Sequence, residues 1–203
     1  LDNCRFGRLT SEIINQCQTY TCSKNADIDS FFHDNTPGNY RDYRLEMMGT
    51  THCFFTDEKD NTTRPKMVCA FSLSNSSLRT DILPNNRRNR LNRSIPNAKR
   101  RFQYPAILIG ELCVFDGFGH KTFGYNIADE MMNLIKTIVI EPGNNSSSRY
   151  LIVDALNSPD VIEYYKRNGF EFLFASDEEE LEHLISGHSS DVQDCRTRLM
   201  FFD

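Results

Sequence analysis

The clearest pattern along the chain is an apolar stripe at helical spacing within residues 124–140. Its members recur every three or four positions and therefore share one face of a helix. They are Ile127, Met131, Leu134, Ile135 and Ile138. Residues 106–115 and 150–156 are instead apolar at nearly every position, which is typical of buried strands. A long helix between two buried strands predicts a mixed α/β domain.

Weaker patterns predict the remaining elements, which the turn and cap residues between them delimit. Before the apolar strand at 106–115, we expect a short helix with an aspartate cap at 26–35 and a helix at 40–48, followed by strands at 51–58 and 65–74 that pair as an antiparallel hairpin. After the strand at 150–156, we expect a helix at 158–170 and an acidic helix at 177–186. The acidic helix lies between closing strands at 170–175 and 196–203. Residues 1–27 are predicted to be an N-terminal extension and 79–104 a basic loop insertion. The whole chain, 1–203, is then a single domain.

Composition sets further bounds on this picture. A chain of 203 residues with 39% hydrophobic and 25% charged residues suits one well-cored globular domain. No apolar run is long enough to predict a membrane-spanning helix. The seven cysteines are scattered and form no Cys-x-x-Cys pair, which argues against a zinc site and a disulfide scaffold. We therefore expect a reducing, cytoplasmic setting and no metal.

Charge is distributed unevenly. Residues 87–101 contain seven basic residues and no acidic one, so the rest of the chain carries −12 against a total of −5. This basic block could bind an RNA phosphate backbone. It could equally be a solvated insertion whose arginines pair with the acidic remainder.

Three segments, in this order, carry a resemblance to a known family. They are "ILIGELCVFD", "KTFGYN" and "NSPDVIEYYKRNGFEF". Together they resemble the GNAT superfamily of acyl-CoA N-acyltransferases, over about residues 28–202, and within it the branch containing aminoacyl-tRNA-acetylating toxins. The resemblance implies a mixed α+β fold: a twisted, mostly antiparallel sheet of six to seven strands, flanked by helices and splayed at the fourth and fifth strands.

The resemblance also implies acetyl-CoA as the co-substrate. Its pyrophosphate would lie on the amides at the start of the long helix, where the helix dipole favours an anion. The residues that match the family's loop are Lys121, Thr122, Phe123, Gly124, Tyr125 and Asn126. The family has Gly or Ala where this chain has Asn126. The alternative is a helix that merely begins beside two glycines.

The pantetheine arm of the cofactor would pair with the backbone of the buried strand, at Leu112, Cys113 and Val114. One strand amide in that region would donate a hydrogen bond to the thioester oxygen as it becomes anionic. Asn157 matches an asparagine that binds the cofactor in the family, and its alternative role is a turn or helix cap.

Two side chains match catalytic roles. Tyr165 matches the family's tyrosine, whose hydroxyl would protonate the departing thiolate, and its alternative is a core aromatic. Glu111 is the candidate base, since burial within an apolar strand would raise its pKa, and its alternative is an ion pair with a loop arginine. The toxin branch has Arg at that position. Asp154 is a second candidate base.

The sequence therefore predicts an N-acetyltransferase that moves an acetyl group from CoA to a primary amine of a small molecule or protein. One alternative is a toxin that acetylates the α-amine of aminoacyl-tRNA, bound through residues 87–101 and silenced by an antitoxin. Another is a non-catalytic CoA-binding module. We expect no membrane partner, and a homodimer is compatible with the sequence.

Overall fold

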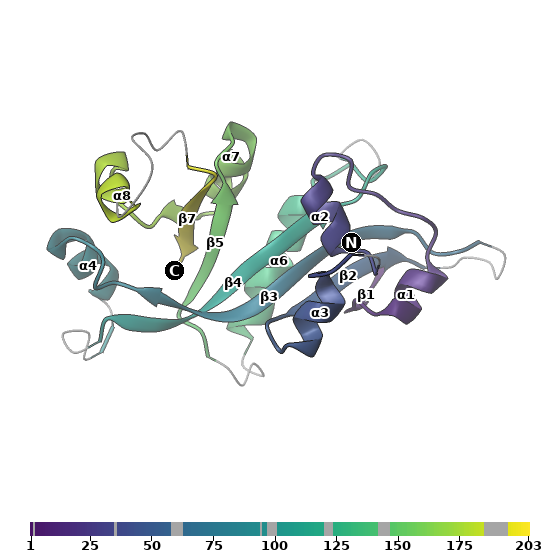
Figure 1. Cartoon of the computed structure of the whole chain (residues 1–203), viewed down its shortest axis with the longest axis horizontal. Helices are drawn as coiled ribbons and strands as arrows, with labels where there is room; N and C mark the ends of the chain where they lie inside the picture. The colour runs from purple at the N-terminus through teal and green to yellow at the C-terminus, as the bar shows by residue number, and fades with distance from the viewer. Residues whose placement is uncertain are drawn as a thin grey trace. The chain divides into compact units, whose positions relative to one another are not determined.

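The structure is a computed structural model. It describes residues 1, 3–34, 36–57, 63–93, 95–96, 101–119, 124–141, 147–184 and 195–203, without the side chains of 183 and 184. Its strands form a seven-stranded sheet in the order β1-β2-β3-β4-β5-β7-β6 (Figure 1). They are β1 (Cys4–Arg8), β2 (Thr50–Thr56), β3 (Met67–Arg79), β4 (Gln103–Val114), β5 (Tyr150–Leu156), β6 (Glu171–Phe172) and β7 (Thr197–Phe202).

Helices flank this sheet, and the longest of them, α6, connects β4 to β5 (Figure 1). They are α1 (Ser11–Gln16), α2 (Ala26–Phe31), α3 (Tyr40–Leu45), α4 (Asn85–Asn92), α6 (Ile127–Ile140), α7 (Pro159–Arg167) and α8 (Asp177–Leu184). The pairs β1–β2, β2–β3, β5–β7 and β6–β7 are antiparallel. The mixed α/β, mostly antiparallel class expected from the sequence is confirmed.

The chain divides into two compact units. Unit 1 comprises Leu1–Asn75 and Ile109–Glu141, and unit 2 comprises Ser76–Leu108 and Pro142–Asp203. Each of the long strands β3 and β4 has one part in unit 1 and its other part in unit 2. Residues 1–27, expected as an extension, supply strand β1 and helix α1 of unit 1.

The core of unit 1 lies between the sheet and its N-terminal helices. Phe31 and Phe32 at the end of α2 and Tyr40 of α3 are buried against Cys53 of β2 and Ala70 of β3. On the opposite face of these strands lies α6 (Figure 1). Three members of its predicted stripe, Ile127, Met131 and Ile135, are buried, and Leu134 and Ile138 are half-buried. Met132, which the predicted stripe did not include, is also buried. Unit 1 therefore has a layer of helices on each side of its strands.

Unit 2 has its own core. Leu83 and Leu91, just before and within α4, pack with Tyr104 of β4, Ile152 of β5 and Phe201 of β7. On the other side of β7, the buried guanidinium of Arg198 binds Asp177 and Glu180 of α8. Among the described residues, no helix is long and apolar enough to cross a bilayer.

Several predicted elements differ from the observed ones. The helix at 26–35 has no aspartate cap, because the side chain of Asn25 accepts the amides of Asp27 and Ile28. The strand at 170–175 is reduced to Glu171–Phe172. Strand β1 was missed because its sequence, CRFGR, has one large apolar residue between two arginines. Edge strands often lack a clear alternating pattern for this reason.

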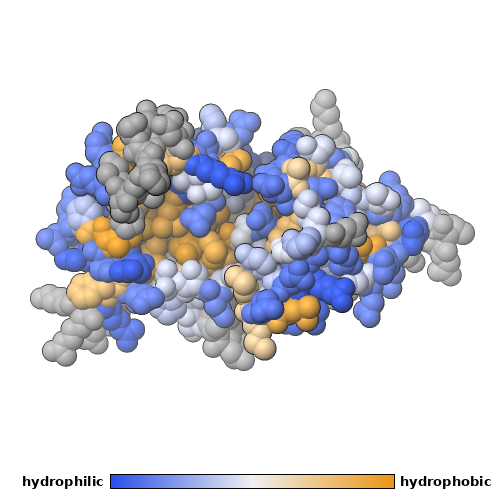
Figure 2. Space-filling view, viewed as in Figure 1, coloured by the Kyte–Doolittle hydropathy of each residue, from blue (hydrophilic) through white to orange (hydrophobic). Residues whose placement is uncertain are grey.

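The end of α3 is unusually apolar for a surface. Leu45, Met47 and Met48 are 69%, 94% and 55% exposed. Figure 2 shows apolar residues at the surface in this region, where Figure 1 places α3. Met47 also has a positive φ of 55°, in the left-handed region that disfavours residues with a Cβ. The chain therefore holds a bulky apolar side chain at a position that suits glycine.

Candidate functional site

The pairing of β3 with β4 contains an irregularity. At one end of the ladder, the Thr80 amide donates to the Phe102 carbonyl at 2.8 Å. At the other end, the Phe115 amide donates to the Val68 carbonyl at 3.0 Å. Between these two bonds β4 has one more residue than β3. An extra residue in one strand of an antiparallel pair is a β-bulge.

Two contacts locate the bulge at Gly110 and Glu111, which both lie opposite Ser72. The Glu111 amide donates to the Ser72 hydroxyl at 2.8 Å. A Cβ built on Gly110 would lie 2.6 Å from the same hydroxyl oxygen. Ser72 is therefore in contact with both residues of the bulge.

The bulge coincides with a change in burial along β4. Ile109 and Cys113 are buried, whereas Gly110 is exposed and Glu111 and Leu112 are half-buried. Because the Glu111 amide points towards β3, the Leu112 amide points to the other edge of the strand. Burial raises the pKa of the Cys113 thiol, which also contacts the Cys22 thiol. Leu112 and Val114 are thus half-buried beside the exposed Gly110, whereas the side chain of Cys113 belongs to the core.

The predicted cofactor loop is described only in its second half. Lys121, Thr122 and Phe123 lie outside the described residues. Gly124 has a φ of +74°, and a Cβ there would meet no atom within 4 Å. Glycine is therefore required at this position by backbone conformation and not by lack of space.

Asn126 has a definite local role. It is the N-cap of α6, and its side-chain oxygen accepts the Ala128 amide at 3.1 Å. Its φ of −86° is ordinary. The asparagine that departs from the family's loop pattern therefore starts the helix. The neighbouring Tyr125 hydroxyl accepts a 2.6 Å hydrogen bond from the amino group of Leu1.

The segment that follows β4 is held by the N-terminal part of unit 1. The carboxylate of Asp116 accepts hydrogen bonds from the Thr21 hydroxyl at 2.8 Å and from the amide and hydroxyl of Ser23 at 3.1 and 3.0 Å. The Thr21 hydroxyl, followed by these bonds from Ser23, lowers the pKa of Asp116. The turn that directly follows β4 is therefore tied to the segment that precedes α2.

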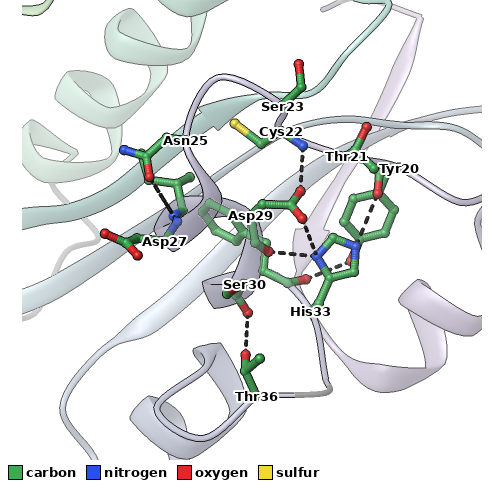
Figure 3. A network of polar contacts seen from close by, with 12 residues as sticks. Tyr20, Thr21, Cys22, Ser23, Asn25, Asp27, Asp29, Ser30, His33 and Thr36 are labelled. Carbon is green, nitrogen blue, oxygen red and sulfur yellow. Dashed lines mark hydrogen bonds and ion pairs between the residues drawn. The ribbon is translucent and has the colours of Figure 1, made fainter.

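A polar network connects the same Tyr20–Ser23 region to α2 (Figure 3). His33 stacks on Tyr20, and its Nδ1 and Nε2 face the carbonyl oxygens of Asp29 at 2.7 Å and Tyr20 at 3.1 Å. The Asp29 carboxylate accepts the Cys22 amide at 2.5 Å. With both ring nitrogens engaged, His33 has a structural role. In the described part of the chain, no cluster of His, Cys, Asp and Glu could hold a metal ion.

The tyrosine pair of α7 lies in unit 2. Tyr165 is only 6% exposed, and its ring meets those of Tyr164 and Phe170 edge-on, with centroids 5.1 and 5.4 Å away. Tyr164 is half-buried and carries the Arg167 guanidinium over its ring. The aromatic packing that we considered as an alternative is thus present at Tyr165, and it fixes the ring.

Asn157 joins the end of β5 to the start of β7. Its side-chain amide donates to the Cys195 carbonyl at 3.0 Å, and its backbone amide donates to the Arg196 carbonyl at 2.9 Å. These bonds give Asn157 a structural function at the end of β5, in addition to its predicted role in binding the cofactor.

Asp154 is an exposed residue of β5 whose neighbours along the strand are buried. It lies directly opposite Leu199 of β7 and shares a face of β5 with Ile152. Figure 2 shows apolar residues reaching the surface over this part of unit 2. Although the residue is exposed at the surface, partial burial of its carboxyl among apolar neighbours raises the pKa of Asp154, and no described residue forms an ion pair with it. A carboxylate shifted in this way is a candidate functional group.

The basic block is only partly available to a partner. Arg87 is 7% exposed and donates to the carbonyls of Leu173 at 3.0 Å and Phe172 at 2.6 Å. Arg90 lies 3.3 Å from the Glu171 carboxylate. Arg88 is half-buried, and its guanidinium lies over the Phe102 ring. Arg87 therefore stabilises unit 2, whereas the exposed Arg93 and Arg101 remain candidates for RNA contact.

Comparison with known proteins gives structural matches only. No family model matches the sequence, and no curated protein is significantly similar to it. A mutant of KacT is 12% identical with a TM-score of 0.60, over 98% of this chain and 94% of KacT. AtaT complexed with acetyl-methionyl-tRNAfMet is 15% identical with a TM-score of 0.56, over 98% and 94%. AtaTR bound with AcCoA is 15% identical with a TM-score of 0.57, over 100% and 94%.

At this level of identity, the matches show the fold. The chain has the same architecture as these proteins over nearly its whole length, which confirms the predicted GNAT-like fold.

Proposed function

We propose that this protein transfers the acetyl group of acetyl-CoA to a primary amine. The observation that carries the proposal is the bulge of β4 in a GNAT-like fold, where Gly110 is exposed and Glu111 and Leu112 are half-buried. AtaTR, which shares the fold, has been solved bound with AcCoA. Gly124 in its left-handed conformation, just before α6, supports a cofactor loop there.

In this reaction the amine nitrogen attacks the thioester carbonyl, a C–N bond forms, and the C–S bond breaks. The oxyanion that develops needs a preorganised donor. The Leu112 amide suits this role, because it points to the edge of β4 away from Ser72. The Tyr165 hydroxyl would protonate the departing thiolate, and the packing of its ring would hold it in one orientation.

The attacking amine must lose a proton, and two carboxylates could accept it. Glu111 belongs to the bulge itself, so its direction depends on the local backbone. Asp154 has a pKa raised by burial, which brings it closer to the range in which a carboxylate is an effective base. A pH–rate profile of Glu111→Gln and of Asp154→Asn assigns the role. The rate of the wild type should fall at acidic pH as the base becomes protonated. The base is the residue whose substitution removes this fall.

A more specific candidate acceptor is the α-amine of an aminoacyl-tRNA. AtaT has been solved with acetyl-methionyl-tRNAfMet, and AtaT has also been solved with the C-terminus of the antitoxin AtaR. In this chain two exposed arginines of the basic block, Arg93 and Arg101, are available to bind phosphate. An antitoxin-type protein is the corresponding partner.

The test is acetyl-CoA consumption by the purified protein with a polyamine, free amino acids or charged tRNA as acceptor. Under the tRNA proposal, only charged tRNA supports turnover. Tyr165→Phe should lower kcat by about 10²- to 10⁴-fold, the usual contribution of a general acid. Tyr164→Phe is the matched control and should leave kcat unchanged. Intact turnover in Tyr165→Phe would show that Tyr165 is not the acid, and no turnover with any acceptor would contradict the proposed function.

A further inference from the structure

We infer that Ser72 is a positioning residue for the acetyl transfer, acting through the bulge of β4. This inference rests on the proposed function. Ser72 makes no contact with reacting atoms in this role. It fixes the backbone that carries the oxyanion donor and one candidate base.

The first observation is the position of the Ser72 hydroxyl. Ser72 is 2% exposed, and its hydroxyl accepts the Glu111 amide at 2.8 Å. The Ser72 side chain thus adds an acceptor on β3 for the amide of the second bulge residue. A bulge without such a bond could slide along the strand.

The second observation is the absence of a side chain at Gly110. A Cβ at residue 110 would lie only 2.6 Å from the Ser72 hydroxyl oxygen, which is too close for two atoms that are not bonded. The serine and the glycine are therefore complementary. Gly110 admits the hydroxyl, and the hydroxyl holds Glu111.

These contacts determine the direction of the groups that follow. With the Glu111 amide bound to β3, the Leu112 amide is directed to the opposite edge of the strand. The Glu111 side chain is directed by the same backbone. Loss of the Ser72 hydroxyl should therefore affect the transition state more than the binding of acetyl-CoA, because the oxyanion donor is used most strongly once charge develops.

The chain supplies a matched control two residues along the same face of β3. The Ser74 hydroxyl would likewise lie 2.6 Å from a Cβ on a glycine, Gly49. Gly49 directly precedes β2 and lies outside β4. Ser74→Ala therefore removes a hydroxyl in a similar environment, away from the bulge.

The experiment compares the wild type with Ser72→Ala, Ser74→Ala and Ser72→Thr. Steady-state kinetics give kcat and KM for acetyl-CoA, and amide hydrogen exchange reports on Glu111. For Ser72→Ala we expect kcat to fall at least tenfold, KM to change less than twofold, and protection of the Glu111 amide to fall about fivefold or more. Ser72→Thr, which keeps a hydroxyl, should recover most of kcat, and Ser74→Ala should behave as the wild type.

The outcomes separate the two proposals. If the wild type is active and Ser72→Ala has the kcat of Ser74→Ala, the positioning role is overturned and the proposed function stands. A rise in KM with unchanged kcat also overturns it, since Ser72 would then act on binding. If the wild type transfers no acetyl group, the proposed function fails. The positioning role then fails with it, even where hydrogen exchange confirms the bond between Ser72 and Glu111.

Discussion

Met47 provides a stability prediction that isolates one backbone angle. It follows the C-cap of α3, its amide donates to the Arg44 carbonyl at 3.1 Å, and the Met48 amide donates to the Tyr43 carbonyl at 2.8 Å. This pair of bonds is the Schellman motif, in which glycine usually occupies the position of Met47. Replacing Met47 by glycine should therefore stabilise the protein.

The magnitude follows from three contributions. A residue with a Cβ in the left-handed region is destabilised by roughly 1–2 kcal/mol relative to glycine. Glycine loses more backbone entropy on folding, which offsets about 0.5–1 kcal/mol. The Met47 side chain is 94% exposed, so its removal loses almost no buried apolar area. We expect a net gain of about 0.5–1 kcal/mol, or about 1–4 °C in Tm for a chain of this size.

Thermal denaturation of the wild type, Met47→Gly and Met47→Ala tests this reasoning. Alanine keeps the Cβ, so Met47→Ala should have the Tm of the wild type to within about 1 °C. If Met47→Gly does not raise Tm, the left-handed strain is not the dominant contribution. If Met47→Ala raises Tm equally, the gain comes from removing an exposed apolar side chain, and the argument from φ is wrong.

Three further predictions concern other sites. Because burial raises the pKa of Asp154 above its ordinary value of 3.8, the folded state loses stability as pH rises through the window between the two pKa values. Asp154→Asn should therefore be more stable than the wild type at pH 7 and gain nothing below pH ~3.8 in urea titrations; an equal gain at both pH values would exclude a charge effect. Arg87→Ala leaves two carbonyl acceptors without their donor and should lower the free energy of unfolding by about 2–3 kcal/mol. Substitution of the exposed Arg93 by alanine should change it by less than about 0.5 kcal/mol. Gly124→Ala should raise KM for acetyl-CoA, because alanine strains the +74° conformation without any clash, and an unchanged KM in steady-state kinetics would separate this glycine from the cofactor.

Much of the fold could be predicted from the sequence where periodicity is strong. The stripe of α6 and the apolar run of β5 predicted both elements, because a helix face and a buried strand have distinct patterns. Strand β1 could not be predicted, since a strand at the edge of the sheet buries little and its pattern is set by its pairing with β2.

At the candidate site, some residues are indicated by the local sequence and others are not. The segment 112–114 and Gly124 could be proposed from the sequence because their predicted roles depend on a strand and a turn that the sequence indicates. Ser72 and Asp116 could not be proposed in this way, since each makes its contact with a residue far away in the sequence. No local pattern predicts that a serine in β3 lies opposite two residues of β4, because a one-residue change of register is decided by tertiary pairing. Only the position of Asp116, directly after a buried strand, offered a signal.

The seven cysteines allow a direct measurement of motion. Five are buried, and burial raises the pKa of Cys53, for example, to about 12, so these thiols react slowly with alkylating reagents. Cys4 in unit 1 and Cys195 in unit 2 are the half-exposed ones. The unmodified protein thus carries one addressable thiol in each unit. Spectroscopic labels on these two thiols would allow the distance between them to be measured with and without acetyl-CoA. A change in that distance would show that the two units respond to the ligand.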